Sequence, residues 1–245
     1  MSTTTDPLDL DDLNSIFEKQ HPSQIVQWAV ARFDGQVMVS SSFGAESMVS
    51  IHLATQVKPD IKIVMIDTGY LFPETHQFME QMRSRFNLNV WTYRTANDPI
   101  AWLKEHGEND PTDRLNIDAC CDANKTAPMR RAMADIAPKA WFRGIRRNQS
   151  ETRKAARFIA HDRTYGNYAI SPILNWGSKE IYQDMKLHNL PYHPMYEKGY
   201  ASIGCNPLSC TRPITLGDDP RAGRWANSAK VECGVNVGSL DDAAL

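Results

Sequence analysis

Residues 36–47, QVMVSSSFGAES, join a short apolar strand to a serine-rich turn and to the start of a helix that continues to residue 56. The stretch IKIVMIDTG, residues 61–69, starts the same pattern again, and PETHQFMEQMRSRF follows it as a helix with Pro73 near its start. A third strand, LNVWTYR, precedes a helix at residues 99–107. Strands that alternate with helices in this way are connected by right-handed crossovers. The sequence therefore predicts an α/β fold with a doubly wound, mainly parallel sheet.

Three parts of the chain differ in composition. Residues 1–35 place apolar side chains at helical spacing and predict a peripheral helical segment. Residues 36–190 hold the alternating elements, with a further strand in KAWFRGI and a last helix in SKEIYQDMKLHNL, and we expect this α/β domain to bind a nucleotide. Residues 191–245 lose periodicity and carry three of the five cysteines, so we expect an irregular tail, packed over the edge of the sheet, that holds metal-binding and catalytic thiols.

The composition limits the class of protein. The chain has 245 residues, 42% hydrophobic and 23% charged, which is typical of one globular domain with or without appendages. A formal net charge of −2 argues against a broad nucleic-acid surface. We expect neither a signal peptide nor a membrane span, and hence a cytoplasmic protein, because no apolar run approaches about 18–20 residues. In a reducing cytosol, five cysteines favour metal binding or redox chemistry over structural disulfides.

The loop after the first strand has the composition of an anion site. Ligands of open parallel sheets bind beyond the carboxyl ends of the strands. Hydroxyl groups, a glycine and a following helix N-terminus suit a phosphate or a sulfate. The candidate residues are Ser41, Ser42, Phe43 and Gly44. The alternative is a serine-rich turn that caps a helix. Neither the Walker lysine pattern nor the three-glycine dinucleotide pattern is present.

A second loop of this kind follows the next strand. Asp67, Thr68 and Gly69 come directly after an apolar run, where a carboxylate and a backbone turn could hold a ribose or an adenine edge. The alternative is again an N-cap and a turn. Two such loops on consecutive strands favour a nucleotide site.

Basic side chains concentrate in two places. The segment FRGIRRNQSETRKAAR, residues 142–157, follows a predicted strand, so its guanidinium groups would converge on a polyanion at the same edge of the sheet. A solvated charged face is the alternative. Arg146 and Arg153 are the candidates from this segment, and DDPRAGRW adds Arg221 and Arg224 from the tail.

Four of the cysteines occur in two groups, Cys120 with Cys121 and Cys205 with Cys210. Such groups hold either zinc or an iron–sulfur cluster. Adjacent cysteines are awkward ligands for one tetrahedral ion, because neighbouring side chains diverge. A [4Fe–4S] cluster offers separate irons to separate thiolates, so the adjacent pair favours a cluster over zinc.

The chain resembles the assimilatory sulfonucleotide reductases, which reduce adenosine 5′-phosphosulfate (APS) or its 3′-phosphorylated form (PAPS) to sulfite. The resemblance covers residues 37–238 and rests on ordered motifs: SSSFGAES, IDTGYLFPET, CCDANK, GIRRNQSETR, GYASIGC with CTRP, RAGRW and ECG. It implies an adenine-nucleotide-hydrolase-like fold, a nucleophilic thiolate at Cys233 in ECG, and electrons from thioredoxin or glutaredoxin. Members that use APS generally carry the four cluster cysteines.

Three departures from the family pattern bear on these implications. CNPLSC places four residues between Cys205 and Cys210, where the family usually has two. ECG continues with Val235 and Asn236 in place of leucine and histidine. IDTGYLFPET is closer to the PAPS branch, whereas the cysteines indicate the APS branch. We give the cysteines more weight and predict APS.

The expected chemistry is attack of the Cys233 thiolate on the sulfur of the phosphosulfate, which gives an S-sulfonate that a thioredoxin thiol then cleaves. Lys125, Arg221 or Arg224 would raise the thiolate fraction of a thiol whose ordinary pKa is about 8.5. One rival is an ATP pyrophosphatase of the same fold that thiolates a substrate such as tRNA. Another is a non-enzymatic iron–sulfur or zinc protein. For the predicted reductase, the expected partners are thioredoxin or glutaredoxin, and a homo-oligomer is compatible with the sequence.

Overall fold

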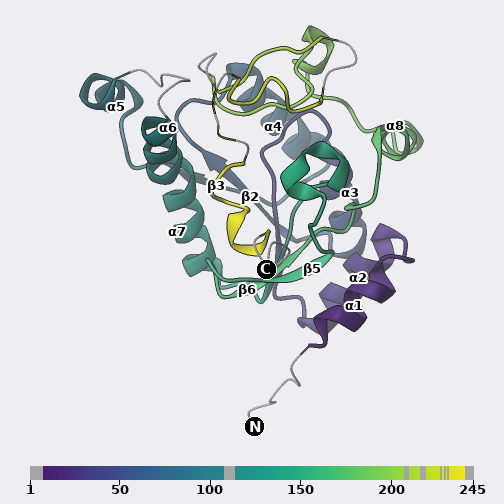
Figure 1. The fold of residues 1–245 in the computed structure, drawn as a ribbon. Coiled ribbons are helices and arrows are strands. Elements are labelled where there is room, and N and C mark those ends of the chain that lie inside the picture. The colour runs from purple at the N-terminus through teal and green to yellow at the C-terminus, as the bar shows by residue number, and fades with distance from the viewer. Residues whose placement is uncertain are drawn as a thin grey trace.

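The protein is represented by a computed structural model that describes residues 8–107, 114–206, 210–215, 219–226, 228, 230 and 232–240. A six-stranded sheet with the order β3-β2-β1-β4-β6-β5 forms its centre (Figure 1). The strands are β1 (Val37–Ser40), β2 (Lys62–Asp67), β3 (Val90–Arg94), β4 (Ala140–Phe142), β5 (Ile159–Asp162) and β6 (Asn167–Ile170). All neighbouring strands run parallel except β5 and β6, which pair antiparallel. The predicted α/β fold with a mainly parallel sheet is confirmed.

Helices follow the strands in the expected alternation. They are α1 (Leu10–Phe17), α2 (Pro22–Arg32), α3 (Met48–Val57), α4 (Pro73–Arg85), α5 (Pro99–His106), α6 (Arg114–Cys121), α7 (Ala127–Ile136) and α8 (Ser178–Leu187). Local signals set several starts: Pro73 opens α4, and the Asp98 carboxylate caps α5 by accepting from the Ala101 N–H at 2.8 Å. A π-helical turn, η1 (Asp122–Thr126), separates α6 from α7 directly after the cysteine pair.

The two faces of the sheet are covered differently, because successive residues of a strand point to opposite sides. Val37 and Val39 of β1 join a large core with the helices α1 to α4 and α8. Met38 faces the other way, into a second core with α7 and with tail residues that include Trp225 and Cys233. These tail residues therefore pack against one face of the sheet, whereas the sequence suggested that the tail lies over its edge.

The N-terminal helices close one edge of the sheet. Strand β5 was not predicted: its four residues, IAHD, mix apolar and polar side chains. The Asn14 side chain of α1 accepts from the Ile159 N–H at 3.2 Å and donates to the Ile159 carbonyl at 2.8 Å. This contact satisfies the outer backbone groups of Ile159, the first residue of the edge strand. Phe17 and Ile25 of the same segment are buried in the larger core, so α1 and α2 flank the molecule in Figure 1 and still contribute to its interior.

The strand order places a crevice between β1 and β4. The chain winds toward β3 on one side of β1 and toward β6 and β5 on the other. At such a switch point the loops after the two central strands diverge and leave room for a ligand. Within the described residues, no helix has the length and apolar character needed to cross a membrane.

Candidate active site

A cavity of about 240 Å³ lies at this switch point, between the loop after β1, the arginine segment after β4 and the tail. Most of the residues predicted from the sequence line it. They are Ser41, Ser42, Gly44, Thr68, Lys125, Arg146, Arg153, Cys205, Arg221, Arg224 and Cys233. The fold thus brings residues from five separate segments to one site. Phe43, Asp67 and Gly69 are not part of its wall.

The serine loop is shaped by its own hydroxyl groups. Ser41 Oγ accepts from the Phe43 N–H at 3.0 Å, and Ser47 Oγ donates to the Gly44 carbonyl at 2.6 Å. Ser47 occupies the N-cap of α3 but makes no side-chain capping bond. The capping alternative therefore does not describe this loop. Phe43 has a left-handed φ of 47° and a fully buried side chain, so it anchors the loop beneath the cavity.

In the loop after β2, some residues shape the turn and another lines the cavity. Asp67 Oδ1 accepts from the Gly69 N–H at 2.9 Å, and Oδ2 pairs with Arg94 Nε at 3.0 Å. Gly69 has a φ of +77°, and a Cβ there would lie 2.6 Å from Pro99 Cγ. The turn alternative thus accounts for Asp67 and Gly69, and Thr68 alone of the three lines the cavity.

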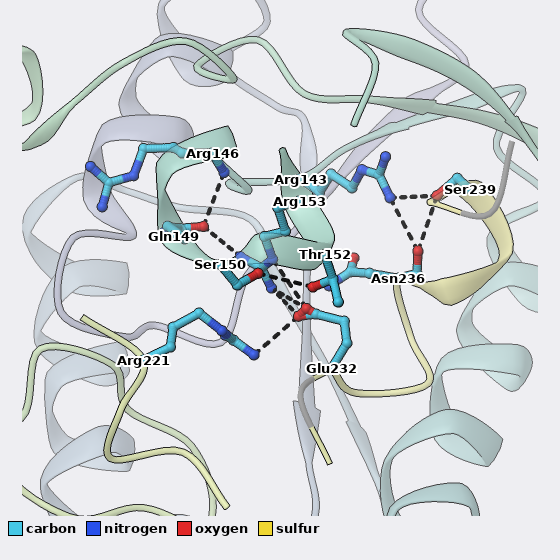
Figure 2. A network of polar contacts seen from close by, with 10 residues as sticks. All are labelled: Arg143, Arg146, Gln149, Ser150, Thr152, Arg153, Arg221, Glu232, Asn236 and Ser239. Carbon is cyan, nitrogen blue, oxygen red and sulfur yellow. Dashed lines mark hydrogen bonds and ion pairs between the residues drawn. The ribbon is translucent and has the colours of Figure 1, made fainter. Parts of the chain in front are cut away.

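Arg146 retains hydrogen-bonding capacity at the cavity. Its Nη2 pairs with Glu46, while its buried Nη1 has no partner among the described protein groups. Burial raises the pKa of the Glu46 carboxyl, and Arg146 only partly counters this effect. Figure 2 shows the Arg146 guanidinium pointing away from the Glu232 carboxylate, on which Arg153 and Arg221 converge.

Arg153 and Arg221 share one carboxylate. Glu232 Oε2 accepts from Arg153 Nε at 3.1 Å and from Nη2 at 2.8 Å, and Oε1 accepts from Arg221 Nη2 at 3.0 Å (Figure 2). Gln149 accepts from Arg153 Nη1. Both arginines were predicted as anion ligands, but the pairing with Glu232 was not anticipated.

Cys233 is buried beside cationic groups. Its side chain belongs to the second core and lines the cavity. Burial by itself would raise the pKa of the thiol, and Glu232 adds to this effect. Lys125, Arg153 and a hydrogen bond from the Val235 backbone together outweigh both, so the pKa is lowered. Cys233 in turn is the main cause of the raised pKa of Lys125. The pair has the electrostatics of a nucleophilic thiolate held by an ammonium group.

The other four cysteines meet at a second, smaller cavity. Cys120, Cys121, Cys205 and Cys210 all line it, together with Thr68, Tyr70, Asn124, Lys125, Arg224 and Trp225. All five thiols of the chain are free of disulfides. Burial raises the pKa of Cys121 to about 12, so this thiol, unlike Cys233, would be ionised only through a strong partner. The residues 207–209 between the last two cysteines lie outside the described chain.

The sequence matches the phosphoadenosine phosphosulfate reductase domain over residues 36–213. The chain belongs to this family. It is 34% identical over 233 residues to the adenosine 5′-phosphosulfate reductase of Halalkalibacterium halodurans, covering 94% of this chain and 97% of that relative. The solved phosphoadenylyl-sulfate reductase of Candida auris superposes with a TM-score of 0.68 at 23% identity, over 84% of this chain and 98% of that one. A tRNA thiolase of Methanococcus maripaludis, solved with its [4Fe–4S] cluster, gives a TM-score of 0.50 at 13% identity, over 74% and 67% of the two chains.

Membership of the family decides between the predicted classes. The resemblance seen in the sequence is confirmed, and the chain is an oxidoreductase that acts on the sulfur of a sulfonucleotide. The likeness to the tRNA thiolase shows a shared fold alone. It does not support the alternative of an ATP pyrophosphatase that thiolates its substrate. The relatives are named as reductases, so the alternative of a non-enzymatic iron–sulfur or zinc protein is not supported.

Sequence reasoning missed several residues at this reductase site. Arg143 is 1% exposed and donates to Ser171 Oγ at 3.0 Å, to the Asn236 carbonyl at 3.4 Å and to Ser239 Oγ. Burial lowers its pKa to about 10. The arginine segment contained the signal, but nothing in the pattern distinguishes Arg143 from its neighbours. Glu232 was visible only as the first letter of ECG.

Proposed function

We propose that the protein reduces APS to sulfite and AMP through an S-sulfonate on Cys233, with thioredoxin or glutaredoxin as the reductant. The observation that carries the proposal is the placement of Cys233, beside Lys125, in the wall of a cavity lined by arginines and the serine loop. The name of the Halalkalibacterium halodurans relative supports APS as the substrate.

The reaction needs only groups that line this cavity. The Cys233 thiolate attacks the sulfur, the sulfur–oxygen bond breaks, and AMP leaves with the bonding electron pair. The serine loop and Arg146 Nη1 offer donors to the phosphate. A thiolate of the reductant then attacks Cys233 Sγ, and sulfite leaves with the electrons of the sulfur–sulfur bond. The second thiol of the reductant resolves the mixed disulfide, so the reductant is oxidised to its disulfide.

We also propose that Cys120, Cys121, Cys205 and Cys210 hold a [4Fe–4S] cluster. Among the described residues, no three histidine, cysteine or carboxylate side chains are arranged to hold a metal ion, yet all four thiols line one cavity. A cluster spreads its ligands over separate irons and so fits this arrangement better than a single zinc ion. When bound, it supplies a brace between α6 and the tail and an electrostatic field beside the substrate. No electron path through it is required.

Three arginines of the cavity are paired with carboxylates, which supports APS over PAPS. Arg153 and Arg221 share Glu232, and Arg146 pairs with Glu46. A 3′-phosphate carries up to two further negative charges and needs cationic partners of its own. PAPS is the second candidate, because IDTGYLFPET resembles the PAPS branch.

The test is the yield of sulfite and AMP from anaerobically purified protein with thioredoxin and either APS, PAPS or ATP. We expect sulfite from APS with a higher kcat/KM than from PAPS, and no pyrophosphate from ATP. A higher kcat/KM with PAPS would reverse the choice of substrate. Pyrophosphate release from ATP without sulfite from either sulfonucleotide would contradict the proposal as a whole.

A further inference from the structure

The carboxylate of Glu232 joins two distant parts of the chain immediately before the nucleophile. Arg153 comes from the segment after β4, Arg221 comes from the tail, and Glu232 precedes Cys233. The side chains of Arg153 and Glu232 are each 7% exposed, so the pair is shielded from solvent. A buried and multiply hydrogen-bonded ion pair fixes geometry far better than an exposed one.

Arg153 has little capacity left for a substrate anion. Its Nε and Nη2 donate to Glu232, and its Nη1 donates to Gln149. Arg153 and Arg221 line the cavity, whereas Glu232 is not among the residues of its wall. Glu232 therefore binds the two arginines from outside the cavity and does not occupy the space where the substrate would sit.

The chain is also held on the other side of the thiol. Arg143 donates to the carbonyl of Asn236 at 3.4 Å, and the Gly238 carbonyl accepts from the Arg163 N–H at 3.1 Å. The residues that follow Cys233 are thus anchored through their own carbonyl groups, by contacts that do not involve Glu232. Before Cys233, Glu232 provides the anchor nearest to the thiol.

We infer that Glu232 is a positioning residue of the reductase reaction: its carboxylate, clamped between Arg153 and Arg221, seats Cys233 Sγ in the cavity. This inference rests on the proposed role of Cys233 as the nucleophile. It changes the assignment of Arg153, which holds Glu232 in addition to its direct electrostatic effect on the thiol and does not bind the phosphosulfate. The same contacts surround a thiol that is buried, with Cys233 8% exposed.

Two effects of Glu232 on Cys233 are separable by experiment. Its negative charge raises the pKa of the thiol, against the lowering by Lys125 and Arg153. A change of charge shifts the midpoint of a pH profile of thiol alkylation. A change in seating alters the plateau rate at high pH, where the thiol is fully ionised and only access limits the reaction.

The experiment is alkylation of the full-length holoprotein by iodoacetamide without substrate, from pH 6 to pH 10. Trypsin cleaves after Lys230, so the C-terminal peptide contains Cys233 as its only cysteine, and mass spectrometry follows that thiol alone. In Glu232→Gln we expect a plateau rate about tenfold higher or more, since a tenfold change in opening needs only about 1.4 kcal/mol. With APS, kcat should fall while KM stays near the wild-type value.

The matched control is Glu18→Gln. Glu18 pairs with Arg147 Nη1 at 2.9 Å, in the same arginine segment but away from the cavity, and its loss should leave the alkylation plateau unchanged. Arg153→Lys should raise the plateau as Glu232→Gln does, and the double variant should be no worse than either single variant. If Glu232→Gln does not fold, the alkylation plateau of Arg153→Lys tests the inference instead.

A wild-type plateau in Glu232→Gln, or a shifted midpoint with an unchanged plateau, would overturn the inference. A raised KM with unchanged kcat in Arg153→Lys would also overturn it, because it would return Arg153 to substrate binding. Absence of sulfite from the wild-type enzyme would count against the proposed function instead, because the alkylation assay uses no substrate.

Discussion

The ammonium group of Lys230 pairs with the carboxylate of Asp118, two residues before Cys120. Lys230 lies three residues before Cys233, so this ion pair ties the segment with the candidate nucleophile to the helix with the adjacent cysteines. Lys125 lies close to both sets of thiols: it lines both cavities, and Cys233 is the main cause of its raised pKa. The candidate cluster site and the candidate nucleophile therefore lie in one connected region of the structure.

Cys233→Ser should bind nucleotide and keep its iron, yet release no sulfite. A serine hydroxyl is essentially un-ionised at neutral pH, and a thioredoxin thiol cannot release sulfite from an oxygen–sulfonate, so the loss should be near-total. Wild-type protein with APS but without thioredoxin should carry one SO₃ group on the C-terminal tryptic peptide. An adduct found on Cys210 would show that the wrong thiol has been assigned.

Anaerobically purified protein should be brown and contain about four irons and four sulfides per chain. Cys120→Ser should lose colour and thermal stability together, because a ligand that links α6 to the cluster is gone. Elemental analysis and the visible spectrum measure both. Stoichiometric zinc in a colourless protein would contradict the cluster.

Replacing Lys125 should shift the pH dependence of Cys233. Lys125 is the largest contribution that lowers the pKa of this thiol, so Lys125→Met raises the pKa and leaves less thiolate at neutral pH. The alkylation profile of the C-terminal peptide should move to higher pH, and sulfite production should recover partly as the pH rises. Lys125→Arg keeps the charge and should stay near the wild-type midpoint. An unshifted midpoint in Lys125→Met, with full iron content, would refute this electrostatic role.

Gly69→Ala should destabilise the protein more than Gly166→Ala. Both glycines have positive φ, +77° and +68°, but an added Cβ meets Pro99 Cγ at 2.6 Å only at Gly69 and has open space at Gly166. The shared conformational strain costs about 1 kcal/mol, and the clash should add about 1–3 kcal/mol. Urea unfolding of the two variants measures the difference. Equal losses of unfolding free energy in the two variants would mean that α5, which begins at Pro99, can shift away from the added Cβ at no energetic cost.

The sequence predicted what depends on local pattern. β1 and β2 are continuous apolar runs, and the serine loop and arginine segment follow strands that end at one edge of the sheet, so their meeting was foreseeable. Pairings between distant residues were not foreseeable. Glu232 meets Arg153 across 79 positions, and Arg143 meets Asn236 across 93, and neither has a local signature. Strand β5 was not predicted either, because a short segment of mixed apolar and polar residues becomes a strand only by pairing with a neighbouring strand.

The contact between Asn14 and Ile159 spans 145 positions of the chain. During synthesis, α1 emerges from the ribosome well before the strand whose edge it covers, and Phe17, which packs against Phe158 directly before that strand, cannot complete its burial until then. Closure of this edge is therefore a late event in folding, with a large loop-closure entropy to overcome. Chains that stall before residue 170 would present apolar helix faces to chaperones, which makes the N-terminal helices a sensitive reporter of incomplete folding.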